Sequence, residues 1–377
     1  MPSLYVHVPF CIRKCAYCAF YSVPLHEKNS KVQAYLQGLK KEIELRREEA
    51  PEGVSSLFVG GGTPTSLTEE ELQIFFALLK QGFNVPETAE QTIEGNPGTL
   101  TREKLRIIKQ AGINRISLGV QAMDDALLRK IGRIHTVQDV REGIRLVRGA
   151  GFKNLNLDLM FGLPGQSLSD WQESLKEAVK LEPEHLSIYG LMVEEETPLA
   201  HNQRLLDILP NDDLQAEMYN WTRSYLSDEG FLHYETSNFA RPGFECQHNL
   251  GYWLGQDYLG LGPGAVSYLH PIRSKNSEDI EHYIHDLEES KLPVEPEEIE
   301  RLTEHERMAE RIILGLRLSQ GVHLDLFRQE FGQDIRDIFP GVLERYIRLN
   351  VLFLNEDTLK LNPDYWFVAN SVLQEFV

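Results

Sequence analysis

The stretch LYVHVPFCIRKCAYCAFYS, residues Leu4–Ser22, places three cysteines directly after an apolar run that is typical of a β-strand. Cys11, Cys15 and Cys18 follow a C-x3-C-x2-C spacing. A [4Fe–4S] cluster has four irons that each need an outer ligand, so three local thiolates would leave one iron open to a small molecule. Structural zinc sites are the alternative, but they pair C-x2-C with a second Cys or His pair, and none follows at such a spacing. The spacing therefore favours a cluster.

The amino-acid composition indicates which kinds of partner the protein can bind and in which cellular compartment it is expected. The 377 residues include 57 acidic and 38 basic ones, for a net charge of −19. Nucleic-acid binding draws on Lys and Arg that neutralise phosphates, so nucleic acid is not expected as the main partner. No apolar stretch is long enough for a transmembrane segment, and no signal-peptide pattern precedes the first strand. Four cysteines, three of them clustered, do not make a disulfide framework. We expect a cytoplasmic protein.

Strand-like and helix-like segments alternate through the first half of the chain. The six strand-like runs are Leu4–Val8, Ser56–Val59, Gln91–Glu94, Arg115–Val120, Asn154–Met160 and His185–Leu191. Two helical segments between them begin with capping-box patterns, Thr68 with Glu71 and Ser169 with Gln172. Six βα units predict an α/β fold with a parallel sheet, doubly wound or curled towards a barrel. No G-x-G-x-x-G follows the first strand, which argues against a nucleotide-binding Rossmann domain.

The pattern changes after about residue 192. Gly230–Phe239 has the composition of one further strand, and a glycine-rich stretch follows it. Glu295–Glu300 is acidic and contains proline, which indicates a linker. We therefore divide the chain into residues 1–230, an extension at 231–294 and a C-terminal accessory domain at 295–377.

The C-terminal residues predict a small, mostly helical domain. Thr303 and Glu306 form another capping-box pattern ahead of an amphipathic helix. A hairpin is expected around Asn355–Asp357, with short helices between. Helices followed by a hairpin suit a winged-helix-like module.

Polar residues and glycines stand where several of the predicted strands end. In a parallel barrel, reactive groups collect at the carboxyl ends of the strands. Gly60–Pro64 (GGGTP) follows the second strand, Glu94 ends the third and Gln121 follows the fourth. Asp158 lies in the fifth strand, and Arg133 follows at a distance that returns it over the barrel mouth. Taken together, these residues predict one ligand site at this end of the barrel.

Together, these motifs resemble those of a known protein family. The chain resembles, nearly end to end, the oxygen-independent coproporphyrinogen III oxidase-like branch of the radical S-adenosylmethionine (SAM) superfamily. The resemblance implies a three-quarter (β/α)6 radical-SAM barrel with a C-terminal accessory domain, and a cluster whose open iron binds the amino and carboxylate groups of SAM. It implies that one or two SAM molecules bind. The residues implied to contact the cluster-bound SAM are Tyr5, Gly61 and Glu94, and those implied to line the neighbouring site are Tyr17, Gly62, Thr63, Gln121, Arg133, Asp158 and Val266.

Two departures from the oxidase pattern bear on the activity. The oxidases carry a fourth cysteine two residues after the third, where this chain has Phe20, and they carry a long segment ahead of the first barrel strand. The run His248–Trp253 (HNLGYW) instead matches the H-N-x-x-Y-W motif of the haem chaperones in this branch. A neutral imidazole is a common haem-iron ligand, and aromatic rings can cover a porphyrin face. Cys246, two residues upstream, could aid haem binding, complete the cluster or be a buried core residue.

The resemblance implies a haem chaperone that uses a [4Fe–4S] cluster, SAM and haem. His248 would bind the haem, and an acceptor apo-haemoprotein would receive it. A homodimer and peripheral contact with a membrane haemoprotein are compatible with this interpretation. The alternative is an enzyme, an oxygen-independent coproporphyrinogen III dehydrogenase that decarboxylates two propionate side chains. A radical-SAM methyltransferase or RNA modifier is disfavoured by the acidic charge balance.

Overall fold

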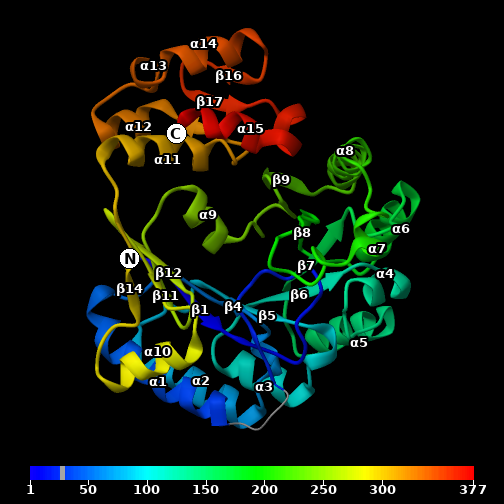
Figure 1. The fold of residues 1–377 in the computed structure, drawn as a ribbon, viewed down its shortest axis with the longest axis vertical. Helices are drawn as coiled ribbons and strands as arrows, with labels where there is room; N and C mark the ends of the chain where they lie inside the picture. Colours follow the sequence, from blue (N-terminus) through cyan, green and yellow to red (C-terminus); the bar gives the residue numbers. More distant parts are fainter. Residues whose placement is uncertain (26–29) are drawn as a thin grey trace.

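A curved sheet with six adjacent parallel strands forms the body of the molecule (Figure 1). The computed structural model describes residues 1–25 and 30–377. In sheet order, these six strands are β1 (Ser3–Val8), β4 (Ser56–Gly61), β5 (Glu90–Gly95), β6 (Arg115–Gln121), β7 (Asn154–Phe161) and β8 (His185–Gly190). A seventh strand, β11 (Tyr258–Leu261), pairs parallel to β1 on its other side. The six predicted strands and the partial (β/α)6 barrel are confirmed.

Further strands extend this sheet at both edges to twelve. Beyond β1 lie β11 (Tyr258–Leu261), β12 (Val266–Leu269), β13 (Ile272–Asn276) and β14 (Val294–Arg301), and beyond β8 lie β10 (Asn238–Ala240) and β9 (Leu232–Glu235). Two expectations are corrected here. Gly230–Phe239 contributes to two strands, and Glu295–Glu300 lies within β14 instead of forming a linker. The acidic side chains of β14 are mostly exposed on an edge strand, where charge discourages further pairing.

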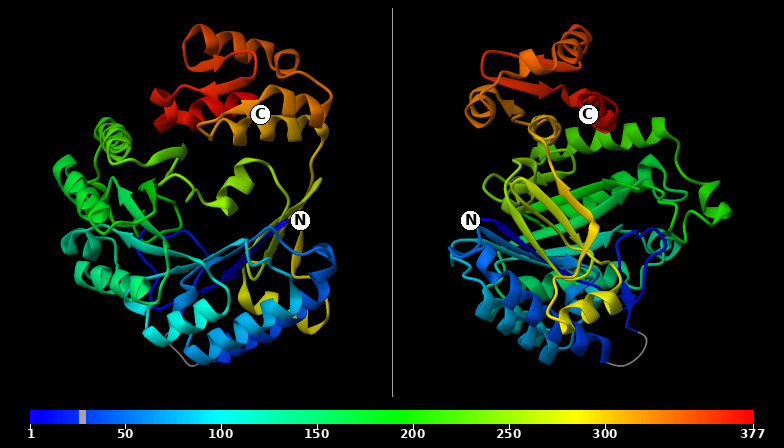
Figure 2. Two further views of the ribbon diagram at one scale, coloured as in Figure 1. Left: turned by 180° about the vertical axis from the view of Figure 1, so that it is seen from behind. Right: turned by 60° about the vertical axis from the view of Figure 1, so that its left-hand side comes forward.

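Side chains that alternate along the strands give the sheet one apolar and one polar face. In β1, Leu4, Val6 and Val8 are completely buried in the main core, while Tyr5 and His7 point to the opposite face. Helices cover the convex side of the sheet (Figure 2). The helices that follow or flank the strands are α1 (Ser30–Arg46), α2 (Glu69–Gly82), α3 (Arg102–Gln110), α4 (Asp125–Lys130), α5 (Val137–Gly149), α6 (Leu168–Val179), α7 (Gln203–Leu206), α8 (Asp212–Asp228) and α10 (Ile280–Glu288). The concave face is therefore left with the polar residues.

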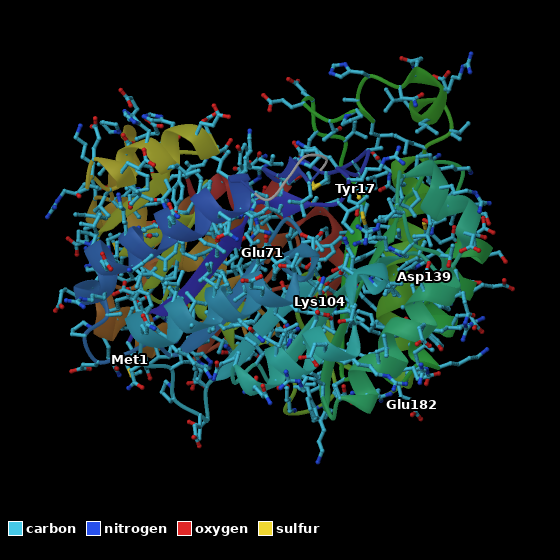
Figure 3. All side chains as sticks on the ribbon, turned by 90° about the horizontal axis from the view of Figure 1, so that it is seen from below. Met1, Tyr17, Glu71, Lys104, Asp139 and Glu182 are labelled. Atoms are coloured by element: carbon cyan, nitrogen blue, oxygen red, sulfur yellow. The ribbon has the colours of Figure 1, made fainter. Side chains whose placement is uncertain are left out.

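Side-chain caps begin several of these helices. Thr68 and Glu71 form the predicted capping box at α2, and Glu71 is labelled in Figure 3. The prediction for α6 is wrong, because Ser167 and Asp170 form the box there while Ser169 lies inside the helix. Two overlapping patterns compete at this site. In the observed box, the Asp170 carboxylate accepts from the Ser167 amide at 2.8 Å and from its hydroxyl at 2.7 Å, and the helix begins two residues earlier than a cap at Ser169 would allow.

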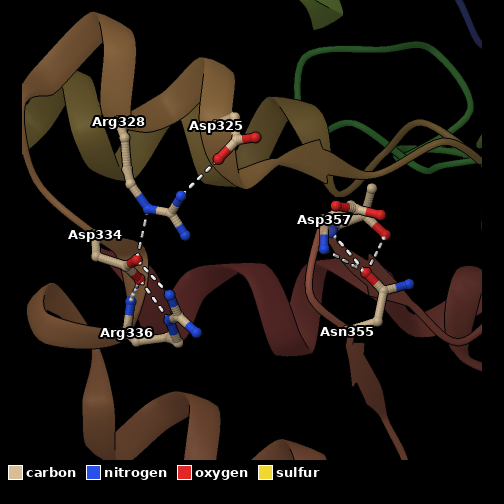
Figure 4. Close-up of polar contacts among 7 residues, drawn as sticks. Asp325, Arg328, Asp334, Arg336, Asn355 and Asp357 are labelled. Atoms are coloured by element: carbon tan, nitrogen blue, oxygen red, sulfur yellow. Dashed lines mark hydrogen bonds and ion pairs between the residues drawn. The ribbon is translucent and has the colours of Figure 1, made fainter.

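The C-terminal domain consists of short helices and a small antiparallel sheet in the order β15-β17-β16. Its elements are α11 (Glu304–Gly315), β15 (Val322–His323), α12 (Leu324–Phe331), α13 (Ile335–Ile338), α14 (Pro340–Arg348), β16 (Leu352–Leu354), β17 (Thr358–Leu361) and α15 (Ala369–Leu373). Figure 4 shows two of its polar anchors. Asp334 pairs with Arg328 at 2.8 Å and Arg336 at 2.6 Å. Asn355 accepts backbone hydrogen bonds across the β16–β17 turn. The predicted capping box at Thr303, the hairpin and the winged-helix-like composition are confirmed.

One short helix lies on the concave side of the sheet. This is α9 (Gln247–Trp253), which stands between the sheet and the C-terminal domain and contacts β4 and α11 (Figures 1 and 2). The division at residues 230 and 294 stays a prediction, and β14 continues the large sheet beyond the second boundary to Arg301. Within residues 1–25 and 30–377, no helix combines the length and apolar character needed to cross a bilayer.

Candidate functional site

The three clustered cysteines lie on one loop beyond the carboxyl end of β1. Cys11 ends β2 (Phe10–Cys11), which pairs with β3 (Val23–Pro24), so the intervening chain forms a closed loop. Cys15 and Cys18 lie within this loop, and the Cys18 amide donates to the Cys15 carbonyl at 3.4 Å. All three cysteines are half-buried. The thiols are thus grouped on one segment and remain accessible to a cofactor.

Glycines allow residues 60–64 at the end of β4 (the glycine loop) to pack against residues 11–23 (the cysteine loop). The amide of Gly62 donates to the Val8 carbonyl at 2.9 Å, and that of Thr63 donates to the Phe10 carbonyl at 2.7 Å. A Cβ on Gly62 would lie only 2.6 Å from the Phe10 carbonyl oxygen. Gly61 has a φ of +105°, which favours glycine. The glycines therefore let this loop pack against the backbone just before Cys11, which positions the cysteines.

Hydrogen-bonding groups surround two of the thiols. The Thr63 hydroxyl lies 3.5 Å from Cys11 Sγ, and Arg133 Nη1 donates to Cys15 Sγ at 3.5 Å. Arg133 also donates to Asn96, whose amide donates to the Thr63 hydroxyl at 3.0 Å. Donors of this kind stabilise thiolates. Asn96 was not among the predicted site residues, although its position directly after β5 was the available signal.

The donor set fits a [4Fe–4S] cluster. Cys11, Cys15 and Cys18 would hold it, and when bound it would supply an open iron for a small molecule together with one-electron redox chemistry. Among the described residues 1–25 and 30–377, no three His, Cys, Asp or Glu side chains form a group that could hold a single metal ion. A zinc ion needs its ligands about 2.0 to 2.3 Å from one centre, whereas a cubane takes each thiolate on a separate iron. Three thiolates suit a cluster with one open iron, whereas a structural zinc site takes four protein ligands.

Glu94 lies at the carboxyl end of β5, beside the glycine loop. Its Oε2 accepts a hydrogen bond from the Gly61 amide at 3.1 Å. Burial raises the pKa of Glu94 to about 8, and the nearby Asp158 carboxylate adds to the effect. Tyr5 is half-buried, and its pKa is raised first by desolvation and then by Glu94. The structure thus brings Tyr5, Gly61 and Glu94 together as the resemblance implied.

The residues implied to line the neighbouring site lie around the carboxyl ends of the parallel strands, at the mouth of the barrel. Gln121 ends β6 in a left-handed conformation, with a φ of 68°, next to a register shift in the sheet. Asp158 of β7 accepts a hydrogen bond from Ser117 at 3.1 Å. Tyr17, labelled in Figure 3, packs against a second apolar cluster that includes Leu163 and Leu199. These side chains, together with Arg133, come from different strands and loops but gather at one end of the sheet.

Val266 lies on the other side of Tyr5. It lines a cavity of about 330 Å³ together with Tyr5, Phe20, Tyr252 and Tyr258. The Phe20 side chain is 70% exposed, so it stands at the mouth of this cavity. The residue that replaces the oxidases' fourth cysteine is therefore an open apolar group beside the cluster loop.

His248 lies on α9 and is buried against β4. Its Nδ1 shares a hydrogen bond of 2.9 Å with Ser56 Oγ, and its Nε2 shares one of 3.1 Å with the Tyr252 hydroxyl. The ring stacks on Phe58 with centroids 5.1 Å apart. Burial, aided by the positive charge of Arg115, lowers the pKa of His248 to about 3. The imidazole is therefore neutral, and in this conformation both of its nitrogens are engaged.

Cys246 lies away from the other cysteines. It is completely buried, and its Sγ donates to Glu90 Oε1 at 3.2 Å. Glu90 begins β5 while Glu94 stands at the opposite end of the same strand. Of the three interpretations considered for Cys246, the structure supports the buried core residue and contradicts a role as fourth ligand to the cluster.

Comparisons with known proteins define the class. Residues 5–178 match the model of the Radical SAM superfamily, and residues 302–368 match the HemN C-terminal domain. The structure superposes on coproporphyrinogen III oxidase (HemN) of Escherichia coli with a TM-score of 0.87 at 24% identity, over 100% of this chain and 90% of that one. The fold is therefore that of a radical SAM protein with a HemN-type C-terminal domain.

Similarity over the whole length identifies the branch. The chain is 37% identical to the haem chaperone HemW of Bacillus subtilis over 382 residues, which cover 100% of this chain and 99% of the relative. It is 32% identical to the haem chaperone HemW of Lactococcus lactis over 376 residues, with coverages of 100% and 97%. The chain belongs to the HemW family. The branch inferred from the sequence motifs is confirmed.

Replacing Cys11, Cys15 or Cys18 singly with Ser should abolish the visible absorbance of the anaerobically reconstituted protein, because each would supply one iron with its only protein ligand. Cys246→Ser is the matched control and should retain the absorbance, since Cys246 lies at the other end of β5. Iron and sulfide analysis provides the second measurement. One zinc per chain without iron or sulfide would contradict the assignment.

The raised pKa of Glu94 predicts a pH dependence of stability. An unfolded glutamate titrates near 4.5 and the folded one near 8, so between these values the folded state binds the additional proton. The free energy of unfolding should therefore fall as the pH rises through this window, and Glu94→Gln should remove that component. Urea denaturation from pH 5 to 8 measures it, with Glu173→Gln on the exposed side of α6 as control. Equal pH slopes for wild type and Glu94→Gln would refute the assignment.

Proposed function

We propose that this protein is a haem chaperone, which binds haem beside α9 and passes it to an acceptor apo-haemoprotein. The observation that carries the proposal is the placement of the H-N-x-x-Y-W residues on the concave side of the sheet, where Asn249, Tyr252 and Trp253 line a cavity. Full-length relatives at 32–37% identity are named haem chaperones, which supports the same role for this chain.

The proposal includes a [4Fe–4S] cluster at Cys11, Cys15 and Cys18 and SAM beside Tyr5 and Glu94. The grouping of these residues at one end of the sheet supports it, as does the match to the Radical SAM model over residues 5–178. We place the protein in the cytoplasm, where thiols are kept reduced and remain available to iron.

We further propose His248 as an axial ligand of the haem iron. Its imidazole is neutral, which is the form that coordinates metals. Its Nε2 is hydrogen-bonded to Tyr252, and Tyr252 lines the cavity beside α9. Tyr252 therefore stands between the imidazole and the cavity, and ligation requires this hydroxyl to leave Nε2.

The enzymatic alternative, a coproporphyrinogen III dehydrogenase, is tested separately. The likeness to HemN at 24% identity concerns the fold, and Phe20 stands at the position of the oxidases' fourth cysteine. An anaerobic assay of the reconstituted protein with coproporphyrinogen III, SAM and a reductant should yield no protoporphyrinogen beyond one turnover. Sustained multiple turnover would overturn the proposal of a chaperone without catalytic activity.

Two variants test His248. His248→Ala should shift or weaken the Soret band of the haem complex, because it removes the proposed ligand. Tyr252→Phe should raise haem affinity by about 2- to 10-fold, since it removes a hydrogen bond of about 0.5 to 1.5 kcal/mol that competes for Nε2. Absorption titration with haemin measures both effects.

Tyr225→Phe on α8 serves as control, because Tyr225 stacks on Trp221 away from α9. It should leave the titration unchanged. A His248→Ala protein whose Soret band and haem affinity match those of the wild type would exclude His248 as the ligand.

A further inference from the structure

A cavity of about 540 Å³ lies between the sheet and the C-terminal domain, within the usual range for small-molecule sites. Its walls come from α9, from strands β8–β13 and from helices α11 and α12. Its lining includes Asn249, Tyr252 and Trp253 from α9, Tyr258, Tyr268 and Arg273 from β11–β13, and Arg307, Arg311 and Glu330 from α11 and α12. None of the predicted SAM-site residues lines this cavity, but Tyr252 and Tyr258 line both it and the smaller cavity beside Tyr5.

Aromatic rings make up one side of the cavity. The rings of Tyr252 and Tyr258 meet edge to face with centroids 4.6 Å apart, and Tyr268 lies 6.2 Å beyond Tyr258. Trp253 adds a fourth ring on α9. Walls of this kind suit a flat, largely apolar ligand, because rings bury large area at a small cost in conformational freedom.

A pair of arginines also lines the cavity, and Arg307 lies next to Tyr268 of the aromatic side. Arg307 and Arg311 are four residues apart on α11, so they share one face of the helix. Their side chains are only 20% and 17% exposed. Both pair with the same carboxylate, Glu330, at 3.5 and 3.3 Å. Glu310, which also lines the cavity, pairs with Arg273 at 2.6 Å. Arg307 and Arg311 thus share the single carboxylate of Glu330, and a ligand carboxylate would balance the second guanidinium.

The arginine pair is held in place before any ligand binds. The Arg307 guanidinium lies 5.1 Å from the centre of the Phe331 ring, and Glu330 anchors both arginines from α12. A guanidinium presents a planar set of donors that matches a carboxylate. The order imposed by these contacts reduces the entropy that binding would cost.

Two buried polar atoms in the cavity lining lack hydrogen-bond partners among the described residues. Asn238 is 3% exposed, and its Oδ1 has no hydrogen-bond partner among the residues that the structure describes. The same holds for the indole Nε1 of Trp253. Both side chains line the cavity. Because buried polar groups are nearly always paired, this part of the lining has the character of a site that is completed by a ligand or its water.

We infer that this cavity is the porphyrin-binding pocket, with the macrocycle against the tyrosine wall and its propionate carboxylates on Arg307 and Arg311. The inference rests on the proposed function. It adds the location of the pocket and the residues that recognise the ligand's acidic groups. Because those residues lie on α11, the C-terminal domain would be needed for binding. It requires a ligand that is both flat and acidic, and a porphyrin with two propionates meets both requirements.

The decisive comparison is between haemin and its dimethyl ester, which keeps the iron and the ring but has no free carboxylates. The full-length wild-type protein should bind haemin about 10-fold or more tightly than the ester, since charged hydrogen bonds to arginine are strong. Arg307→Ala/Arg311→Ala should lose most of this preference while keeping its affinity for the ester. Retained ester binding shows that the pocket is still folded.

The control is Arg345→Ala/Arg348→Ala, which makes the same change in charge on α14 of the same domain. It should retain the preference for haemin. If the wild type binds neither ligand, the proposed function itself fails. If the wild type binds haemin and the ester equally, or if the α11 variant keeps the full preference, the chaperone proposal stands and the pocket assignment is overturned.

Discussion

The contact between the glycine loop and the cysteine loop is the constraint on which the site depends. The Thr63 amide holds the Phe10 carbonyl at 2.7 Å, directly before Cys11. Only glycine fits at position 62, because a side chain would collide with that same carbonyl. The docking places the thiols, the Thr63 hydroxyl and the carboxylate of Glu94 around one point. Without it, the cysteine loop would have no fixed position relative to the sheet.

A second constraint follows from the polar concave face. Tyr5, Phe58 and His248 lie in successive contact, with ring centroids 6.3 and 5.1 Å apart, and His248 bonds to Tyr252. Tyr252 and Tyr258 line both the smaller cavity beside Tyr5 and the larger one under the C-terminal domain. The cluster side and the α9 side are thus separated by two tyrosine rings. A ligand that moves either ring would change the shape of both cavities.

Local patterns predicted much of this arrangement, and long-range contacts account for the rest. The strands and the capping box at Thr68 follow from alternation and from side-chain chemistry within a few residues. Glu295–Glu300 was mistaken for a linker because its pairing partner, β13, is what makes it a strand. Asn96 and the shared Glu330 were missed for the same reason, since their roles appear only when distant segments meet. The site at the mouth was predictable because parallel strands place their ends together, whereas a pocket between domains has no such rule.

The strand directions also bear on the choice between chaperone and oxidase. Cys246 and His248 lie beside Glu90 and Ser56, which begin β5 and β4, while Glu94 marks the cluster end of β5. Four residues of strand span about 13 Å. Abstraction of a hydrogen atom requires contact between the reacting groups. Tyr252 and Tyr258 would stand between a porphyrin held under the C-terminal domain and the smaller cavity beside Tyr5. This placement argues against direct contact between that porphyrin and the cluster chemistry.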